Sequence, residues 1–311
     1  MKFVSFLALC QSYIGVLLVD ATPTGPEDFN SRIKLIKENP SNEGKPQFQT
    51  KSQNISVPDA LHYVTHALFA SSPENILARD LDNPRNVYDV DKYNVKYNSD
   101  KTTRALILLD HKRNEIILGF RGTANLDNWV SNLKIGQVDF IAGKVHKGFK
   151  KMADDLKESY KGLLTSYIKK YPKYTLVVTG HSLGGALAVL STAILQKELN
   201  IEWEKIILIT YGQPRVGNQA FASWLNSKPM HVTRVVNQND IYPHLPPKTK
   251  NGYVHANTEI YLNDKIAHVC QSTGFEAKTC SNSRAPKLST KPHDLYLYRA
   301  SLKKVIYGGE F

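Results

Sequence analysis

Short apolar runs alternate with amphipathic stretches through the central part of the chain. The polar turn at 110–114 joins the first two runs as a hairpin. Beyond it, runs of strand length alternate with stretches of helical periodicity, which predicts a mostly parallel sheet with helices on both faces, an α/β fold. The strand-like runs lie at 105–109, 115–120, 175–179, 205–211, 232–236 and 258–262. The helix-like stretches start at Pro58 and cover 148–170, 186–190 and 218–226, and a last one begins near Lys291.

The pattern changes at the N-terminus. A basic start, an apolar run over 3–19 and a small residue at Ala21 predict a signal peptide over 1–21, with a signal anchor as the alternative. Residues 22–55 are polar and proline-rich, which predicts a flexible or pro-like segment. Residues 56–311 are then expected to form a single domain. No later apolar stretch is long enough to span a bilayer, so no integral span is expected after cleavage.

Composition supports a folded domain. Of the 311 residues, 41% are hydrophobic and 10% aromatic, and the formal net charge is +12. The lysines are scattered and no nucleic-acid-binding motif is visible, so a soluble basic surface is favoured over a nucleic-acid partner, and weak adsorption to anionic lipid is compatible with it.

Secretion gives meaning to two further features. Cleavage after Ala21 would leave Cys270 and Cys280, which in an oxidising compartment most simply form one disulfide, with two unpaired buried thiols as the alternative. No second cysteine pair accompanies them, so no zinc site is predicted. Asn54 opens an Asn-Ile-Ser sequon for N-glycosylation.

The most informative motif is Gly-His-Ser-Leu-Gly-Gly at 180–185. It follows the apolar run at 175–179 and precedes a helix-like run. A strand, a Gly-x-Ser-x-Gly turn and a helix in that order are typical of a nucleophile elbow, which exposes the serine at a helix N-terminus. The alternative is a glycine-rich turn with an incidental serine. The flanking elements favour Ser182 as a nucleophile.

A serine hydroxyl needs a base, and the base needs an acid that orients it. In α/β-hydrolases both follow the serine, the acid first. Asp240 follows the run at 232–236, although a loop aspartate often only caps a turn. Among the histidines after Asp240, His293 is favoured because it lies in a loop that enters a helix, and His268 is the next candidate.

Two further groups complete the predicted site. The oxyanion would be bound by the backbone N–H of Leu183 and by Thr123, which follows the strand-like run at 115–120; an ordinary strand exit capped by threonine is the alternative at position 123. After Thr123, apolar residues recur at helical spacing in a very short segment. Such a helix is marginal in isolation, so a lid that shifts at a lipid surface is a reasonable interpretation, and ordinary core packing is the alternative. The apolar lid positions are Leu126, Trp129 and Val130.

These segments together resemble the secreted fungal class 3 lipases. The resemblance runs in family order from about residue 58 to 300. It is carried by Phe-Arg-Gly-Thr at 120–123, Asn-Trp at 128–129, Val-His-Lys-Gly-Phe at 145–149, the serine motif, Tyr-Gly-Gln-Pro-Arg-Val-Gly-Asn at 211–218, Asn-Asp-Ile-Tyr-Pro-His-Leu-Pro-Pro at 239–247 and His-Asp-Leu-Tyr at 293–296.

The resemblance implies an α/β-hydrolase fold with Ser182 as nucleophile, Asp240 as acid and His293 as base. It also implies oxyanion donors at Thr123 and Leu183, a lid around 124–132, and a Cys270–Cys280 disulfide similar to one found in relatives. The chain departs from the family in two respects. It lacks the cysteines of other family disulfides, and its residues around Tyr242 and His244 differ from the usual ones, so the resemblance does not define the groove that binds the acyl chain.

The function expected from these features is that of a secreted carboxylic-ester hydrolase, specifically a triacylglycerol lipase that works as a monomer at a lipid–water interface on acylglycerols, with neither metal nor organic cofactor. A phospholipase A1 or a feruloyl-type esterase on the same scaffold is the alternative, and a non-catalytic lipid-binding protein is a further one. The alternatives for location are the cell wall and the lumen of the secretory pathway.

Overall fold

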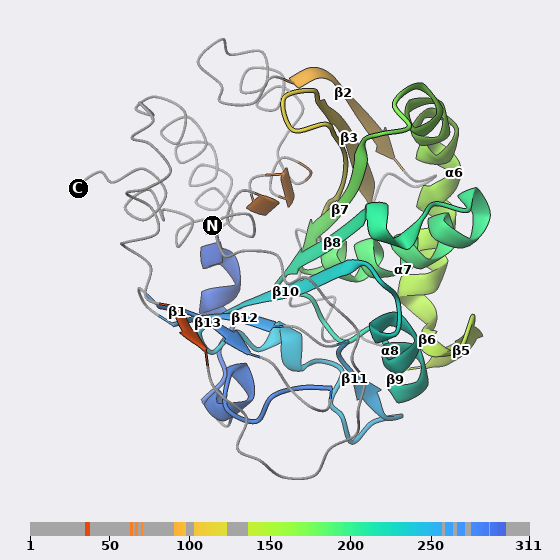
Figure 1. Ribbon diagram of the computed structural model, residues 1–311. Coiled ribbons are helices and arrows are strands. Elements are labelled where there is room, and N and C mark those ends of the chain that lie inside the picture. The colour runs from red at the N-terminus through yellow and green to blue at the C-terminus, as the bar shows by residue number, and fades with distance from the viewer. Residues whose placement is uncertain are drawn as a thin grey trace, which may run out of the picture.

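A nine-stranded sheet forms the centre of the part of the chain that the computed structural model describes (Figure 1). Its strands follow the order β1-β13-β12-β10-β8-β7-β4-β3-β2. Neighbours from β4 through β12 are parallel, whereas β2, β3 and β4 pair antiparallel with one another in turn, as do β12 and β13. This is an α/β-hydrolase fold, and the predicted mostly parallel sheet is confirmed.

The described residues are 35–37, 63–64, 66–67, 70, 90–97, 103–122, 136–256, 259–263, 266–270, 275–285 and 287–296. The main-sheet strands are Leu35–Lys37 (β1), Val90–Tyr97 (β2), Arg104–Asp110 (β3), Glu115–Phe120 (β4), Thr175–His181 (β7), Ile206–Tyr211 (β8), His231–Asn237 (β10), Glu259–Asn263 (β12) and Ile266–Cys270 (β13). A smaller antiparallel sheet contains Gln137–Phe140 (β5), Gly143–His146 (β6), Gly217–Asn218 (β9) and Tyr253–Val254 (β11).

Two long helices, α6 and α7, pack against each other on one face of the main sheet (Figure 1). The helices are Lys147–Lys170 (α6), Leu183–Leu199 (α7) and Gln219–Asn226 (α8), and the 3₁₀ helices are Trp203–Lys205 (η1), Tyr242–His244 (η2), Ser281–Arg284 (η3) and Lys291–Leu295 (η4). The helix expected near Lys291 is therefore a short 3₁₀ turn. Strand β1 lies inside the segment expected to be flexible or pro-like and pairs with β13.

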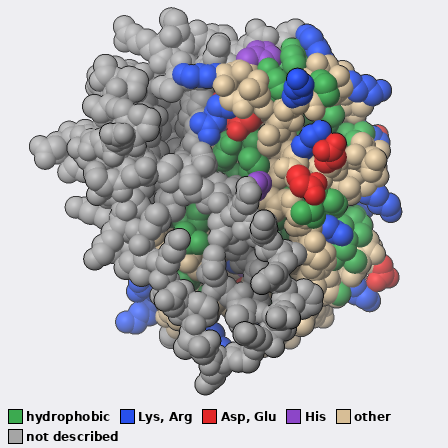
Figure 2. All heavy atoms as spheres, viewed as in Figure 1, with side chains coloured by type: hydrophobic (Ala, Val, Ile, Leu, Met, Phe, Trp, Pro, Cys, Tyr) green, Lys and Arg blue, Asp and Glu red, His purple; other side chains and the backbone are tan. Residues whose placement is uncertain are grey.

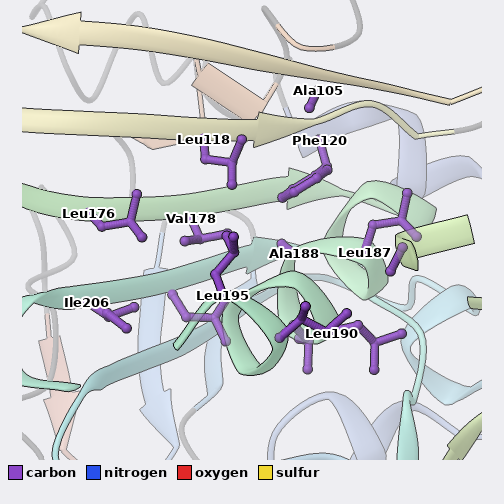
Figure 3. Close-up of a cluster of buried hydrophobic side chains, with 14 of the residues drawn as sticks. Ala105, Leu118, Phe120, Leu176, Val178, Leu187, Ala188, Leu190, Leu195 and Ile206 are labelled. Carbon is purple, nitrogen blue, oxygen red and sulfur yellow. The ribbon is translucent and has the colours of Figure 1, made fainter. Parts of the chain in front are cut away.

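Alternation along the strands assigns side chains to the two faces of the sheet. Leu118 and Phe120 of β4 point to the α6–α7 side and pack with Val178 and Leu187 (Figure 3). Gly119 between them faces the other way, where a Cβ would lie 3.1 Å from the backbone oxygen of His66. The helical residues 63–64 and 66–67 thus cover that second face, and they lie within the helix predicted to begin at Pro58.

Helix α7 is buried along its first thirteen residues, Leu183 to Leu195. A helix that is apolar on all sides needs burial on all sides, and α7 obtains it between the sheet and α6. This burial fixes the N-terminus of α7 rigidly against the strand ends, which is where the candidate site lies.

The described part of one face shows scattered charge. Among the coloured residues of Figure 2, Lys and Arg side chains are dispersed among polar and apolar ones and do not merge into one basic patch. Within the described ranges, no helix combines the length and apolar character needed to cross a membrane.

Candidate active site

Ser182, Asp240 and two glycines that pack beside the site follow the carboxyl ends of four adjacent parallel strands, whereas His293 lies in η4. Gly122 comes after β4, Ser182 after β7, Gly212 after β8 and Asp240 after β10. These strands are neighbours in the sheet, in the order β10-β8-β7-β4. Because the carboxyl ends of parallel strands meet at one edge, segments far apart in sequence converge there.

Ser182 lies in a strained turn between β7 and α7. Its φ is 56° and its ψ is −127°, a region that non-glycine residues rarely adopt. Its backbone N–H donates to the oxygen of Tyr211 at 2.8 Å, which ties the turn to the end of β8. The residue is 1% exposed, so the serine that the elbow motif was expected to expose is buried in this structure. Leu183 is the first residue of α7, so its N–H belongs to the unpaired donors at a helix N-terminus.

Glycine at position 184 allows this turn to form. A Cβ on Gly184 would collide with the backbone oxygen of Phe120 at the end of β4. Helix α7 therefore approaches β4 as closely as two backbones permit, and this approach presses the serine turn against Gly122, where a Cβ would lie 3.4 Å from the Cβ of Ser182.

Asp240 and His293 form a buried pair. The Nδ1 of His293 lies 2.8 Å from Oδ2 of Asp240, and both side chains are fully buried. Their loops are joined by backbone hydrogen bonds on both sides of Ser289, one from the N–H of Ile241 to its oxygen and one from its own N–H to Asn239. Asp240 and His293 are thus held as one unit.

The protonation of the pair follows from burial. Burial lowers the pKa of His293 to about 3, so its imidazole is neutral at neutral pH. Burial also raises the pKa of Asp240 to about 7, while hydrogen bonds from Tyr296 and from the N–H of Tyr242 act to lower it. A neutral imidazole whose Nδ1 donates to a carboxylate leaves Nε2 as a proton acceptor, which is the form that a general base requires.

Two contacts connect this pair with the serine turn. His181, the residue before Ser182, places its ring 4.4 Å from the ring of His293 and its Nε2 3.0 Å from the backbone oxygen of His293. Gly212, beside Tyr211, has φ +57° and lies so close to the pair that a Cβ would be 2.8 Å from Cε1 of His293. The Oγ of Ser182 and the Nε2 of His293 are buried and have no hydrogen-bond partner among the described residues.

The other histidines considered as bases lie elsewhere. His268 is on β13, with its ring 6.0 Å from that of Tyr261. His255 contacts the backbone oxygen of Pro243 through Nε2 at 2.7 Å. His244 is in η2, and burial followed by the charge of Arg215 lowers its pKa to about 4. Among the described residues, Asp240 forms an ion pair with His293 and with no other histidine.

Comparison with known proteins identifies relatives of this chain. Residues 117–250 match the family model described as Lipase (class 3). A lipase of Rhizomucor miehei is 37% identical over 201 residues, which are 62% of this chain and 55% of that protein. Secreted mono- and diacylglycerol lipase 1 of Fusarium solani is 36% identical over 162 residues, which are 51% of this chain and 47% of that protein. The chain spans about half the length of the curated relatives it matches.

A solved structure extends the match over a longer range. It is described as a triacylglycerol lipase whose catalytic centre is formed by a serine protease triad. It superposes with a TM-score of 0.66 at 32% identity and covers 76% of this chain and 92% of its own. The chain belongs to the class 3 lipase family.

Several expectations for this class 3 family member lie outside the described residues. They are the second oxyanion donor Thr123, the lid residues Leu126, Trp129 and Val130, the sequon at Asn54 and the signal peptide over 1–21. These stay predictions.

The Cys270–Cys280 disulfide is present in the structure. With Glu259 these cysteines make up the one cluster of possible metal ligands in the described ranges. Disulfide sulfurs are not thiolate ligands. The carboxylate of Glu259 is engaged by Arg234 at 3.3 Å and by the N–H of Ser281 at 2.9 Å. The cluster therefore serves to join β10, β12 and the disulfide loop.

The family motifs contain His181 and Tyr296, and Asn237 lies just before the 239–247 motif, but the sequence did not reveal the contacts of these three residues. His181 packs on His293, Tyr296 contacts Asp240, and the amide of Asn237 donates to the backbone oxygen of Pro292 at 2.8 Å. The His-Asp-Leu-Tyr motif contained Tyr296, but only the fold shows which group its hydroxyl meets.

Proposed function

We propose that this protein is a secreted carboxylic-ester hydrolase of the triacylglycerol lipase type, with Ser182 as nucleophile, His293 as base and Asp240 as the acid that orients it. Nε2 of His293 takes the proton of the Ser182 hydroxyl while Oγ attacks the ester carbonyl. The tetrahedral intermediate collapses to an acyl-serine, and the alcohol leaves with the proton from His293. Water, activated by the same imidazole, then releases the fatty acid and restores the serine.

The negative oxygen of each tetrahedral intermediate needs preorganised donors. The N–H of Leu183, at the N-terminus of α7, is one, and Thr123 is the other. Gly122, the residue before Thr123, lies against the serine turn, which supports a donor from that loop. The buried Asp240–His293 pair beside the strained serine turn is the observation that carries the proposal.

The first test replaces the nucleophile. Purified Ser182→Ala should fold normally and lose ester hydrolysis by about a millionfold, since a serine nucleophile acts as one unit with its base. Ser191→Ala is the matched control, because Ser191 is a fully buried serine of helix α7, which follows Ser182, and lies outside the site. A fluorophosphonate should label the unaltered protein and the control but not Ser182→Ala. Hydrolysis retained by Ser182→Ala would remove the assignment.

The proposal that acylglycerols are the substrates is based on the proposed lid. The apolar positions Leu126, Trp129 and Val130 suit a segment that meets a lipid surface, whereas a soluble aromatic ester needs no such face. The names of the relatives, a lipase and a mono- and diacylglycerol lipase, support the same class.

A substrate panel decides among the scaffold's chemistries. It should contain mono-, di- and triacylglycerols of several chain lengths, phosphatidylcholine, and methyl ferulate. Emulsified acylglycerols are expected to give the highest kcat/KM. A preference for phosphatidylcholine or methyl ferulate would replace the lipase proposal with a phospholipase or a feruloyl esterase. Labelling of Ser182 without turnover of any ester would indicate a lipid-binding protein.

A further inference from the structure

Tyr296 lies at the centre of the contacts around the Asp240–His293 pair without belonging to the three proposed catalytic residues. Its side chain is 2% exposed. Its ring is 6.1 Å from that of His293 in a T-shaped arrangement and 5.3 Å from that of His181. Its hydroxyl is 2.7 Å from Oδ2 of Asp240, the same oxygen that receives Nδ1 of His293.

The direction of this hydrogen bond is fixed by a second one. The backbone N–H of Asn237, at the end of β10, donates to the hydroxyl oxygen of Tyr296 at 2.9 Å. A hydroxyl has a single proton, and an N–H cannot accept one, so the proton of Tyr296 is directed to Asp240. The main chain of the central sheet therefore orients a hydrogen-bond donor toward the acid.

Asp240 depends on such donors because it is fully buried. Burial without compensation favours the protonated carboxyl. Oδ1 receives the N–H of Tyr242, and Oδ2 receives His293 and Tyr296. The titratable groups that face Asp240 are His293 and Tyr296 from the η4 region and His181 from the end of β7; no Lys or Arg side chain in the described ranges forms an ion pair with it.

We propose that Tyr296 is a positioning residue of the hydrolytic site, whose hydroxyl keeps Asp240 ionised and holds Oδ2 in place for Nδ1 of His293. This role rests on the proposed function. A carboxylate that loses this donor is protonated at higher pH, and a protonated Asp240 neither fixes the imidazole tautomer nor stabilises the imidazolium formed during attack. The effect belongs to the chemical step, since the buried hydroxyl is already committed to Asn237 and Asp240.

The test is the pH dependence of Tyr296→Phe, which removes the hydroxyl and keeps the ring. Loss of a hydrogen bond to a charged group should lower kcat about ten- to hundredfold at neutral pH. The acid limb of the pH profile should move up by about one to two pH units, with recovery at alkaline pH and an unchanged KM. The rate of fluorophosphonate labelling of Ser182 should show the same shift, without any lipid surface.

Tyr261→Phe is the matched control. Tyr261 lies on β12, and its hydroxyl accepts a hydrogen bond from Nε of Arg284 at 2.6 Å, away from the Asp240–His293 pair. It should leave kcat and the pH profile unchanged. A folded Tyr296→Phe, checked by thermal unfolding, with the profile of the unaltered protein would overturn the role. Should the variant not fold, NMR of the unaltered protein supplies the second measurement. A slowly exchanging Tyr296 hydroxyl proton that shifts as Asp240 titrates is expected, and a rapidly exchanging one would overturn the proposal.

Failure of the underlying function has a different signature. If the unaltered protein neither hydrolyses esters nor is labelled at Ser182, the proposed function is wrong, and the proposed role of Tyr296 is wrong as well. If the unaltered protein is active and only the pH shift is missing, the inference about Tyr296 alone is wrong.

Discussion

Gly212 packs directly against the Asp240–His293 pair. Its φ of +57° is costly for any residue with a side chain, and a Cβ there would lie 2.9 Å from Nδ1 of His293 and 3.0 Å from Oδ2 of Asp240. Both backbone conformation and space therefore demand glycine at this position. The absence of a side chain is what allows the pair to pack against the end of β8.

Gly212→Ala should displace the imidazole and reduce kcat. A misplacement of about 1 Å costs roughly a hundredfold in rate, so a fall of at least that size is expected in an ester-hydrolysis assay. Gly252→Ala is the matched control, because Gly252 also has a positive φ, +65°, but no heavy atom within 4 Å of its Cβ position. Equal effects of the two substitutions would assign the loss to backbone strain and not to the contact with His293.

The strained serine turn, which carries the proposed nucleophile, could be located from sequence because its signal is local. Ser182 has a glycine turn, a strand and a helix within a few residues of it. Asp240 and His293 needed a rule of chain order and a family resemblance, since nothing in the sequence states that these loops meet. The partners His181 and Tyr296 could not be predicted, because the identity of their contacts is set only when β7, β8 and β10 bring separate segments together.

At the scale of elements, Arg215 joins the loop after β8 to two other loops. Its guanidinium donates to the backbone oxygens of His244 and Pro246 and forms a two-bond ion pair with Glu276, at 2.8 and 2.9 Å. The side chains of Arg215 and Glu276 are 4% and 3% exposed. Through these bonds, Arg215 connects the disulfide loop, which contains Glu276, to the segment that follows Asp240.

The Arg215–Glu276 pair predicts a loss of stability in acid. Burial alone would raise the pKa of Glu276, but the hydrogen bonds from Arg215 and the charges of His255, Arg215 and Arg234 together outweigh it and hold the pKa well below its usual value of 4.5. A pKa lower in the folded than in the unfolded state gives stability that is present above about pH 4.5 and is lost as the pH falls below it. Denaturant unfolding at several pH values should show this slope.

Glu276→Gln should flatten that acid slope. It should also lower the free energy of unfolding at pH 7 by about 3–5 kcal/mol, because it leaves Arg215 buried without a counter-charge. Glu202→Gln serves for comparison, since its partner Lys205 and its own side chain are exposed, and the change there should stay within about 0.5 kcal/mol. A Glu276→Gln protein as stable as the unaltered one would show that the pair is dispensable.

The long, strongly periodic elements were predicted well, and the short or polar ones were not. Helix α6 and strands β3, β4, β8 and β10 lie within a few residues of their predicted ranges. Strands β9 and β11 have two residues each and exist only because β6 and each other offer backbone partners. Strand β1 is likewise defined by pairing with β13, within a segment whose composition predicted no element.

At the scale of the whole molecule, the predicted processing can be tested directly. The protein recovered from culture medium should begin at Thr22 or later, and a glycosidase that removes N-linked glycans should increase its mobility. Asn54→Gln should abolish that mobility change without altering specific activity. Retention of residues 1–21 in a membrane fraction would favour the signal-anchor alternative.

The coupling of the acid loop to residue 289 has a consequence for synthesis. Chains are made from the N-terminus, and domains begin to fold while they emerge. The nucleophile turn and the parallel strands can form early, but the imidazole at position 293 and the backbone bonds that hold its loop arrive only near the end of the described chain. On the proposed function, a half-made polypeptide crossing a lipid bilayer carries the serine without its base. On this proposal, the growing chain cannot hydrolyse esters until residue 293 has been added and its loop has closed.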